Sequence, residues 1–179
     1  MFAKTVVLAP VSGKVLIRVP GAAYPTRLTG ARTVPVGTVV DTNAARVRLT
    51  SANPQPGSTQ SGQFFGGTFQ IRQMRSAGGL VSLLLHDATS RQSGCGTAPA
   101  HASAASKRIL GLLRGSAKGH FRTVGRFSAA TVLGTNWGVR DRCDGTLTVV
   151  RTGVVVVTDF TLHKNVTVRA GQTYLAKAP

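Results

Sequence analysis

Apolar and polar residues alternate along several parts of this chain, and the alternation predicts β-strands. The segment RVRLT places Val47 and Leu49 on one side of an extended backbone and its two arginines on the other. The segment GTFQIRQ repeats the pattern, with Phe69 and Ile71 on one face. A period of two is that of a strand buried on one face. We therefore expect both segments to contribute side chains to a hydrophobic core.

Short apolar runs bounded by turn residues predict the other strands. The pair Asp144-Gly145 lies between two such runs and is a strong hairpin signal. The apolar start of the chain is too short for a signal peptide with its flanks and is interpreted as a first strand. Further strands are expected at residues 14–19, 33–40, 80–85, 120–124, 130–139, 146–151, 154–159, 166–170 and 173–176.

Three segments lack this alternation. Residues 53–62 are rich in Pro, Gly, Ser and Gln and predict a loop. Residues 107–114 (KRILGLLR) are compatible with a short helix or with a strand bent at Gly111. From about residue 88 to 107 the chain is mostly Ser, Ala, Gly and Thr, which predicts a long flexible insertion.

Strands at intervals of 8–12 residues with almost no helix predict an all-β fold of stacked short antiparallel strands. A β-sandwich of jelly-roll type, a small barrel and a β-solenoid remain open as architectures. The 179 residues are ample for one core, so we expect a single domain over residues 1–179 that carries the insertion. No apolar run is long enough for a transmembrane helix, and the protein is not expected to span a membrane.

The charge balance of the chain is its most unusual bulk property. Lys and Arg number 22 against five Asp and no Glu, which gives a net charge of +17. Such a chain attracts polyanions, whether nucleic acid, anionic cell-wall polymer or an acidic membrane surface. Arginines outnumber lysines sixteen to six, a ratio that fits bidentate phosphate recognition but fits a GC-rich genome at least as well.

The chain contains two cysteines, Cys95 and Cys143. Cys95 lies in the Ser/Gly-rich insertion and Cys143 lies at a hairpin, so a disulfide between them would tie the insertion to the sheet. That pairing requires an oxidising compartment. The alternative is two free thiols. Neither cysteine has His or acidic partners at the spacing of a metal site.

Catalytic chemistry finds little support in the sequence. No nucleophile elbow, dinucleotide-binding pattern or phosphate-binding loop is present. Asp141 and Asp144 are the one close pair of carboxylates, but at a tight turn Asp is expected to bind the backbone. We therefore expect no catalytic residues, no metal and no cofactor. The histidines are scattered without the spacing of a ligand pair: His86, His101, His120 and His163.

A cluster of basic residues is the remaining candidate site. Phe121 and Phe127 are interleaved with it, as in proteins that stack single-stranded nucleic acid. Nucleic-acid binding would require the basic residues to line one groove and Phe121 to be exposed. The alternative is that the phenylalanines belong to the core and the cations to a solvated face. The candidate residues for polyanion binding are Arg108, Arg114, Lys118, Arg122 and Arg126.

The order of several short motifs resembles the FecR-like domain of bacterial envelope proteins. In the N-terminal half the similar segments are VSGKVLIRVPG and LTGARTVPVGTVVDTNAARVRLTSA. Together with residues 119–160 and 166–176 they cover about three quarters of the chain. The motifs in the C-terminal half are Gly134-Thr135 with Trp137, Asp144-Gly145-Thr146, Gly153 with Val154 and Val156, and Val168 to Gly171.

The resemblance implies an extracytoplasmic domain made only of strands. The form with Cys143 in DRCDGT is similar to domains attached to cell-surface proteins of high-GC Gram-positive bacteria. The iron-signalling members of the family carry a membrane helix that this sequence does not show, so only fold and compartment are carried over.

We therefore expect a non-enzymatic structural or binding module outside the cytoplasm. Its expected partners are another protein or an anionic cell-envelope polymer. Nucleic acid is the alternative partner, bound through residues 107–126. Self-assembly through the Val-rich residues 154–157 also stays open, because an uncovered edge strand invites pairing.

Overall fold

The computed structural model describes residues 2–86, 95 and 107–179. These residues form fifteen β-strands and one short 3-10 helix, η1 (Arg75–Ala77), so the predicted all-β class is confirmed. The predicted insertion, residues 88–107, lies outside the described residues except for Cys95 and Lys107. Among the described residues, no helix is long and apolar enough to cross a membrane.

The strands follow one another with short connections over most of the chain. In the first half they are β1 (Thr5–Gly13), β2 (Leu16–Arg18), β3 (Thr26–Arg27), β4 (Arg32–Pro35), β5 (Val39–Asp41), β6 (Ala45–Ala52), β7 (Thr59–Phe65), β8 (Thr68–Gln73) and β9 (Val81–Leu85). In the second half they are β10 (Ile109–Val124), β11 (Ser128–Arg142), β12 (Gly145–Thr152), β13 (Val154–Asp159), β14 (Lys164–Arg169) and β15 (Thr173–Lys177).

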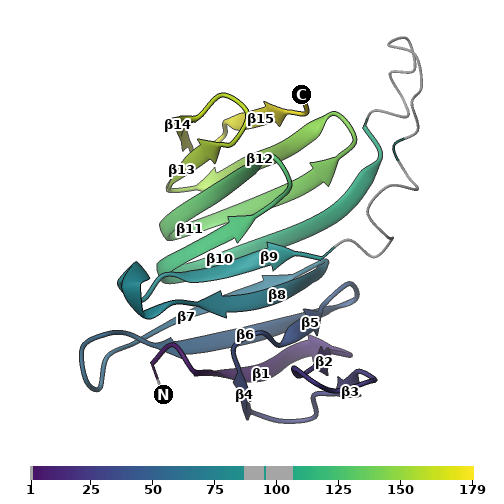
Figure 1. Ribbon diagram of the computed structural model, residues 1–179, viewed down its shortest axis with the longest axis vertical. Coiled ribbons are helices and arrows are strands. Elements are labelled where there is room, and N and C mark those ends of the chain that lie inside the picture. Colours follow the sequence, from purple (N-terminus) through teal and green to yellow (C-terminus); the bar gives the residue numbers. More distant parts are fainter. Residues whose placement is uncertain (1, 87–94, 96–106) are drawn as a thin grey trace.

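The hairpin of β10 and β11 organises the whole sheet. Its strands are 16 and 15 residues long and pair with each other along nearly their full length. On its other edge β10 pairs first with β7 and then, in parallel, with β9. β11 likewise pairs with β12 near its C-terminal end and with β13 near its start. Each long strand therefore belongs to two parts of one curled, mixed sheet (Figure 1).

We name these two parts by the strand that flanks β10. The β7 layer contains β4, β1, β6, β7, β12 and β15, with the first half of β10 and the second half of β11. The β9 layer contains β3, β2, β5, β8, β9, β13 and β14, with the remaining halves of the hairpin. In both layers, alternate side chains point inward to one hydrophobic cluster.

Aromatic side chains join the two layers in the core. Phe64 of the β7 layer has its ring centroid 5.9 Å from that of Phe69 and 5.4 Å from that of Phe121, both in the β9 layer. Trp137 packs edge-on against Phe64 and donates a 3.1 Å hydrogen bond from Nε1 to the hydroxyl of Thr123. All four rings are essentially without solvent exposure.

The hairpin bends from one layer into the other at a β-bulge. Lys118 and Gly119 of β10 stand opposite the single residue Gly134 of β11, because Ala117 pairs with Thr135 and His120 pairs with residue 133. Gly119 has a φ of 118°, a conformation that favours glycine. An extra residue in one strand bends it and increases its twist.

Two buried glutamines satisfy the backbone beside this bend. Gln60 accepts a 2.6 Å hydrogen bond from the His120 backbone N–H and donates one of 2.6 Å to the Gly79 carbonyl. Gln73 donates to the same carbonyl at 3.0 Å and to that of Ala52 at 3.1 Å. These amides replace ladder bonds where β7 and β9 diverge from β10, as buried backbone groups require.

Several predictions of local structure are confirmed and others are wrong. Val47, Leu49, Phe69 and Ile71 are buried, as their alternation predicted. Of the two alternatives for residues 107–114, the structure has the strand, which begins at Ile109 and shifts its register next to Gly111.

The loop predicted at residues 53–62 ends early, because β7 begins at Thr59. The inward side chains of β7 are those of Gln60, Gly62 and Phe64. Two of these positions therefore hold a hydrogen-bonded amide and a glycine instead of the apolar residues that the alternating pattern of a strand predicts. A side chain at position 62 would come within 2.7 Å of the Ala117 Cβ, which accounts for the glycine.

Residues 154–157 are not an edge of the sheet, contrary to the prediction. They belong to β13, which β14 covers along its full length and β11 covers from Val155 onward. Within the described chain, the strands with one partner are β3, β4, β14 and β15. Pairing of copies through the valines of β13 is therefore blocked by β14.

Candidate polyanion-binding face

The structure distributes the predicted basic cluster over different surfaces. Arg114 and Lys118 point outward from the β7 layer. Arg122 lies on the outward side of the β9 layer, where its guanidinium donates hydrogen bonds of 3.1 and 3.3 Å to the Ser82 hydroxyl. Arg126 lies in the turn between β10 and β11, and Arg108 precedes β10. The bend of the hairpin thus separates residues that are close in sequence.

Phe121, which nucleic-acid stacking required to be exposed, is fully buried. It belongs to the aromatic cluster between the layers, as the core interpretation of this residue expected. Phe127 is half-buried beside Arg126, whose guanidinium carbon lies 5.4 Å from its ring centroid. The described part of the basic cluster therefore presents no fully exposed phenylalanine.

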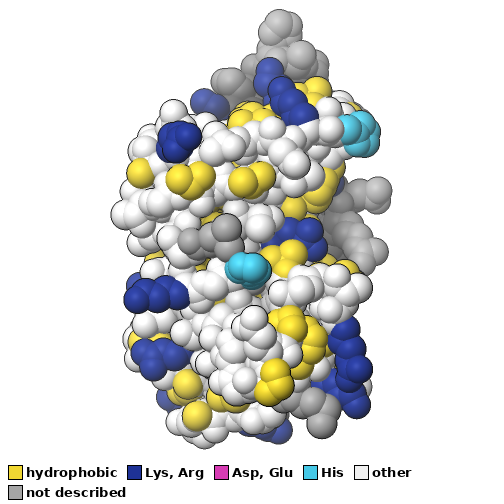
Figure 2. All heavy atoms as spheres, turned by 90° about the vertical axis from the view of Figure 1, so that its left-hand side faces the viewer, with side chains coloured by type: hydrophobic (Ala, Val, Ile, Leu, Met, Phe, Trp, Pro, Cys, Tyr) yellow, Lys and Arg dark blue, Asp and Glu magenta, His cyan; other side chains and the backbone are white. Residues whose placement is uncertain are grey.

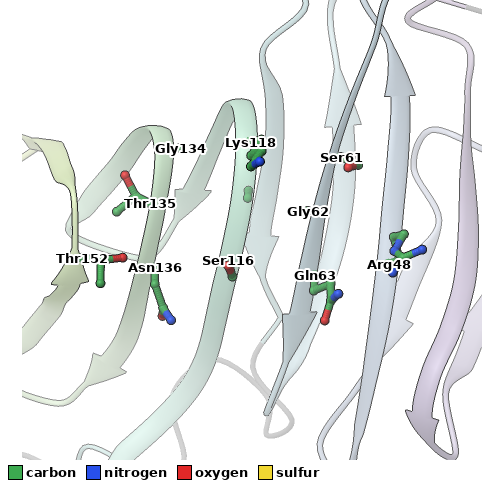
Figure 3. A pocket seen from close by; sticks show the side chains of 11 residues that line it. Arg48, Ser61, Gly62, Gln63, Ser116, Lys118, Gly134, Thr135, Asn136 and Thr152 are labelled. Atoms are coloured by element: carbon green, nitrogen blue, oxygen red, sulfur yellow. The ribbon is translucent and has the colours of Figure 1, made fainter.

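A row of polar side chains crosses the outward face of the β7 layer. Strand register aligns Arg48 with Gln63, Gln63 with Ser116, Ser116 with Asn136, and Asn136 with Thr152. Figure 3 shows these five residues side by side over β6, β7, β10, β11 and the end of β12. Neighbouring strands lie ~4.8 Å apart, so the row extends for about 19 Å.

Cations flank this row. Arg46 stacks over Phe65 with its guanidinium carbon 4.0 Å from the ring centroid, and Arg114 stands opposite Phe65 on β10. Two open hollows lie on this surface, with volumes of about 470 and 270 Å³ and Asn136 in the lining of both. The cations that line them are Arg48 and Lys118 in the first, and Arg114, Arg140 and Arg151 in the second. We call these five cations, with the polar row, the basic face.

The carboxylates that could neutralise this face are used elsewhere. Asp141 and Asp159 are buried at 1 % exposure, and Asp144 is paired with Arg142. Asp41 accepts hydrogen bonds from the backbone and side-chain nitrogens of Asn43. Asp87 lies outside the described residues. No Asp lines either hollow. Figure 2, which shows one side of the molecule, has Lys and Arg side chains spread over its length and no Asp or Glu in view.

Asp141 and Asp144, the one candidate pair for acid–base chemistry, have structural partners. Asp141 accepts bonds of 3.0 and 3.1 Å from the Arg126 backbone N–H and a further bond from the Thr146 hydroxyl. The hydrogen bond from Arg142 holds the pKa of the Asp144 carboxyl below its ordinary value, and burial opposes this only in part. Asp141 therefore joins β11 to the β10–β11 turn and to Thr146 of β12, whereas Asp144 is held by the Arg142 side chain at the β11–β12 turn.

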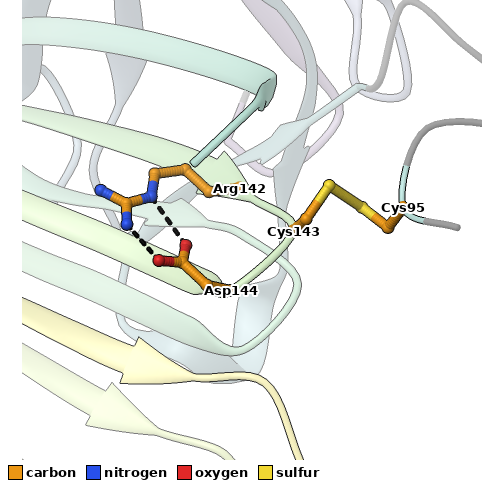
Figure 4. Close-up of a disulfide and its surroundings, with 4 residues drawn as sticks. All are labelled: Cys95, Arg142, Cys143 and Asp144. Atoms are coloured by element: carbon orange, nitrogen blue, oxygen red, sulfur yellow. Dashed lines mark hydrogen bonds and ion pairs between the residues drawn. A yellow bond between two sulfur atoms is a disulfide. The ribbon is translucent and has the colours of Figure 1, made fainter. Parts of the chain in front are cut away.

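The predicted disulfide between Cys95 and Cys143 is present (Figure 4). It closes a loop across 48 positions of sequence and attaches residue 95 to the β11–β12 turn, next to the Arg142–Asp144 ion pair. Among the described residues, no group of three or more His, Cys, Asp or Glu side chains could hold a metal ion. Of the histidines, His101 lies outside the described residues.

Comparison with protein-family models, curated proteins and solved structures found no match to this chain. The resemblance to FecR-like domains therefore stays a hypothesis drawn from the motifs. Sequence reasoning missed Arg48, Gln63, Asn136, Arg140 and Arg151 as members of one face. The strict alternation that turns Arg48 outward was visible, but the register that places it in line with Asn136 was not.

Proposed function

We propose that this chain is a non-enzymatic, extracytoplasmic binding module of a bacterial cell-surface protein, and that its basic face binds an anionic polymer of the cell envelope. The observation that carries the proposal is the gathering of five cations on one outward sheet face whose hollows no carboxylate lines. A linear polymer bearing phosphate or carboxylate groups has the matching charge and an extended shape.

The shape of the face favours an extended ligand over a compact one. Its cations come from four strands, β6, β10, β11 and β12, and the polar row between them runs perpendicular to those strands. Arg guanidinium groups bind carboxylate and phosphate oxygens in bidentate fashion. The amide and hydroxyl groups of Gln63, Ser116 and Asn136 are suited to neutral polar groups of the same polymer.

The compartment is proposed on separate grounds. The Cys95–Cys143 disulfide is compatible with an oxidising environment outside the cytoplasm. The resemblance to FecR-like domains of the bacterial envelope points the same way. In that setting the anionic polymers of the cell wall are polyanions that a protein of this charge would attract.

The test compares the removal of two charges from each layer. Arg114→Gln with Arg140→Gln removes two cations of the basic face, whereas Arg72→Gln with Arg122→Gln removes two outward cations of the β9 layer. Binding of the full chain to polygalacturonate and to polyphosphate is measured by calorimetry at several salt concentrations. Since a cation near an anionic surface contributes on the order of 1 kcal/mol, the first pair is expected to weaken binding about tenfold or more.

The control pair is expected to change the affinity less than threefold, at equal net charge. Equal losses in the two double variants would contradict the proposal, because binding would then depend on total charge alone. Single-stranded DNA of matched charge is measured in parallel. Stronger binding of DNA than of both other polymers, lost in the same variants, would favour the nucleic-acid alternative.

A further inference from the structure

The turn between β13 and β14 exposes two large apolar side chains. Phe160 is 40 % exposed and Leu162 is 59 % exposed. Every residue from 160 to 165 is exposed, so the turn projects from the body of the protein. Single apolar residues on a surface are common, but Phe160 and Leu162 lie two positions apart on one projecting turn.

The backbone of this turn is held rigidly from inside. The buried carboxylate of Asp159 accepts hydrogen bonds of 2.9 Å from the Thr161 N–H and 2.8 Å from the Leu162 N–H. Its other oxygen accepts a 2.8 Å bond from the Tyr174 hydroxyl on β15. The Thr161 hydroxyl also donates to the Lys177 carbonyl at 3.2 Å. The apolar side chains therefore project from a fixed scaffold.

The last residue of the turn adopts a backbone conformation that is uncommon for its type. His163 has a φ of 51°, in the left-handed region where glycine is favoured. A non-glycine residue persists there only when the surrounding structure holds it. Here the hydrogen bonds of Asp159 and the register of β13 with β14 hold it.

One cation, Lys164, lies beside Phe160, and a second, Arg126, lies on the adjoining turn. His163, Lys164 and Asn165 line an open hollow of about 470 Å³ together with Phe160. Asp159 also lines it and carries a negative charge, but its carboxylate is buried at 1 % exposure and accepts hydrogen bonds from the turn and from Tyr174. The Phe160 N–H donates a 2.9 Å bond to the Phe127 carbonyl, which places the exposed Arg126 on the adjoining turn.

We propose that this turn docks onto the surface of a phospholipid bilayer that contains anionic lipids. Phe160 and Leu162 enter the region between headgroups and acyl chains, while Lys164 and Arg126 lie over the phosphates. Apolar side chains next to cations are what an anionic bilayer surface binds. This surface is separate from the basic face, which lies on β6, β7, β10, β11 and β12 of the other layer.

The size of the feature favours a bilayer over a protein partner. A stable protein interface buries about 800 Å² on each side and requires a matching shape. Two side chains on a projecting turn fall well short of that area. A fluid lipid interface adapts to the side chains that enter it, and aromatic rings are favoured at its polar boundary.

The test must separate insertion from adsorption of a strongly basic protein. Tryptophan is introduced as Phe160→Trp and, for comparison, as Met74→Trp. Met74 suits the comparison because it is 59 % exposed, as Leu162 is, but immediately precedes η1. The native Trp137 is buried at 1 % exposure and contributes a constant background. Quenching of tryptophan fluorescence by brominated lipids is measured with vesicles of equal parts phosphatidylcholine and phosphatidylglycerol.

Insertion of the turn is expected to quench the tryptophan at position 160 and to leave that at position 74 unquenched. In vesicle sedimentation, Phe160→Ser with Leu162→Ser is expected to lower binding about tenfold or more, and Met74→Ser less than twofold. Equal quenching at both positions would overturn the proposal, and so would equal vesicle binding of all variants in the sedimentation assay.

Discussion

The two layers of the curled sheet share the β10–β11 hairpin, yet their outward faces differ in kind. Outside the β7 layer, cations line two hollows with a polar row between them and no carboxylate in the lining. Outside the β9 layer, Arg122 is bonded to Ser82 and Arg72 to Gln70, and Val154 and Val156 are exposed. The bend of the hairpin therefore divides its own side chains, with those of the flanking strands, between two different surfaces. Three contacts connect the layers, which we call the aromatic, the polar and the backbone joint, and a substitution in each tests this division.

The aromatic joint is expected to give the largest effect. Phe64→Ala removes the ring that contacts Phe69, Phe121 and Trp137, and should lower the free energy of unfolding by about 3–5 kcal/mol. The next residue is the control, because Phe65 points outward under Arg46. Phe65→Ala should cost about 1 kcal/mol. Equal losses in urea denaturation would show that the two layers do not meet at Phe64.

The polar joint between Asp159 on β13 and Tyr174 on β15 should follow in size. Asp159→Asn removes charge-assisted bonds to two N–H groups and one hydroxyl, and should cost about 1.5–3 kcal/mol at neutral pH. Asp41→Asn is the control, since that carboxylate bonds within an exposed turn and should cost less than about 1 kcal/mol. A smaller loss for Asp159→Asn than for Asp41→Asn would contradict this joint.

The same joint predicts how stability depends on pH. Burial would raise the pKa of Asp159, but bonds from Leu162, Tyr174 and Thr161 outweigh it and the pKa is lowered. The stability that this carboxylate contributes is thus present above pH ~4 and is lost as the pH falls through its folded pKa. Burial first, then the bond to Asp159, raises the pKa of Tyr174, so that its contribution is lost as the pH rises above ~10. Asp159→Asn should flatten the acid limb of the stability curve and Tyr174→Phe the alkaline limb.

The backbone joint at the bulge is expected to show the smallest effect. Gly119→Ala forces a side chain into a φ of 118° and within 2.5 Å of the Gln60 side chain, which should cost about 1–2 kcal/mol. Gly30→Ala is the control, because no atom lies within 4 Å of its added Cβ. It should change the free energy of unfolding by less than about 0.5 kcal/mol. If thermal denaturation shifts both variants alike, the bend does not depend on glycine.

Local pattern predicted most strands, and the exceptions have identifiable physical causes. β7 escaped prediction because Gln60 and Gly62 occupy inward positions, the first satisfied by hydrogen bonds and the second required by the close approach of Ala117. Residues 107–114, expected as a short helix or a bent strand, and the strand expected at 120–124 belong to one strand from Ile109 to Val124, because pairing continues across the bulge at Lys118 and Gly119. Residues typical of turns, such as Gly119, can therefore lie at a β-bulge inside a strand as well as between two strands.

The residues that share each candidate surface could not be predicted from local pattern either. Alternation indicated that Arg48 would point outward, but Arg48 and Lys118 are 70 positions apart and share a hollow only through the register of β6, β7 and β10. Arg122, close to Lys118 in sequence, lies on the other layer because the hairpin bends between them. Proximity in sequence was therefore a poor guide to the membership of the basic face.

The sequence by itself determined the all-β class, the inward residues of the alternating strands and the positive charge. These properties follow from the period of two and from composition, which are local. Only the tertiary structure decided which cations share a surface, where Phe121 lies, and that the turn at Phe160 and Leu162 is fixed by Asp159 and Tyr174. Strand register and the bend of the hairpin depend on contacts between segments far apart in the chain, and no local pattern contains them.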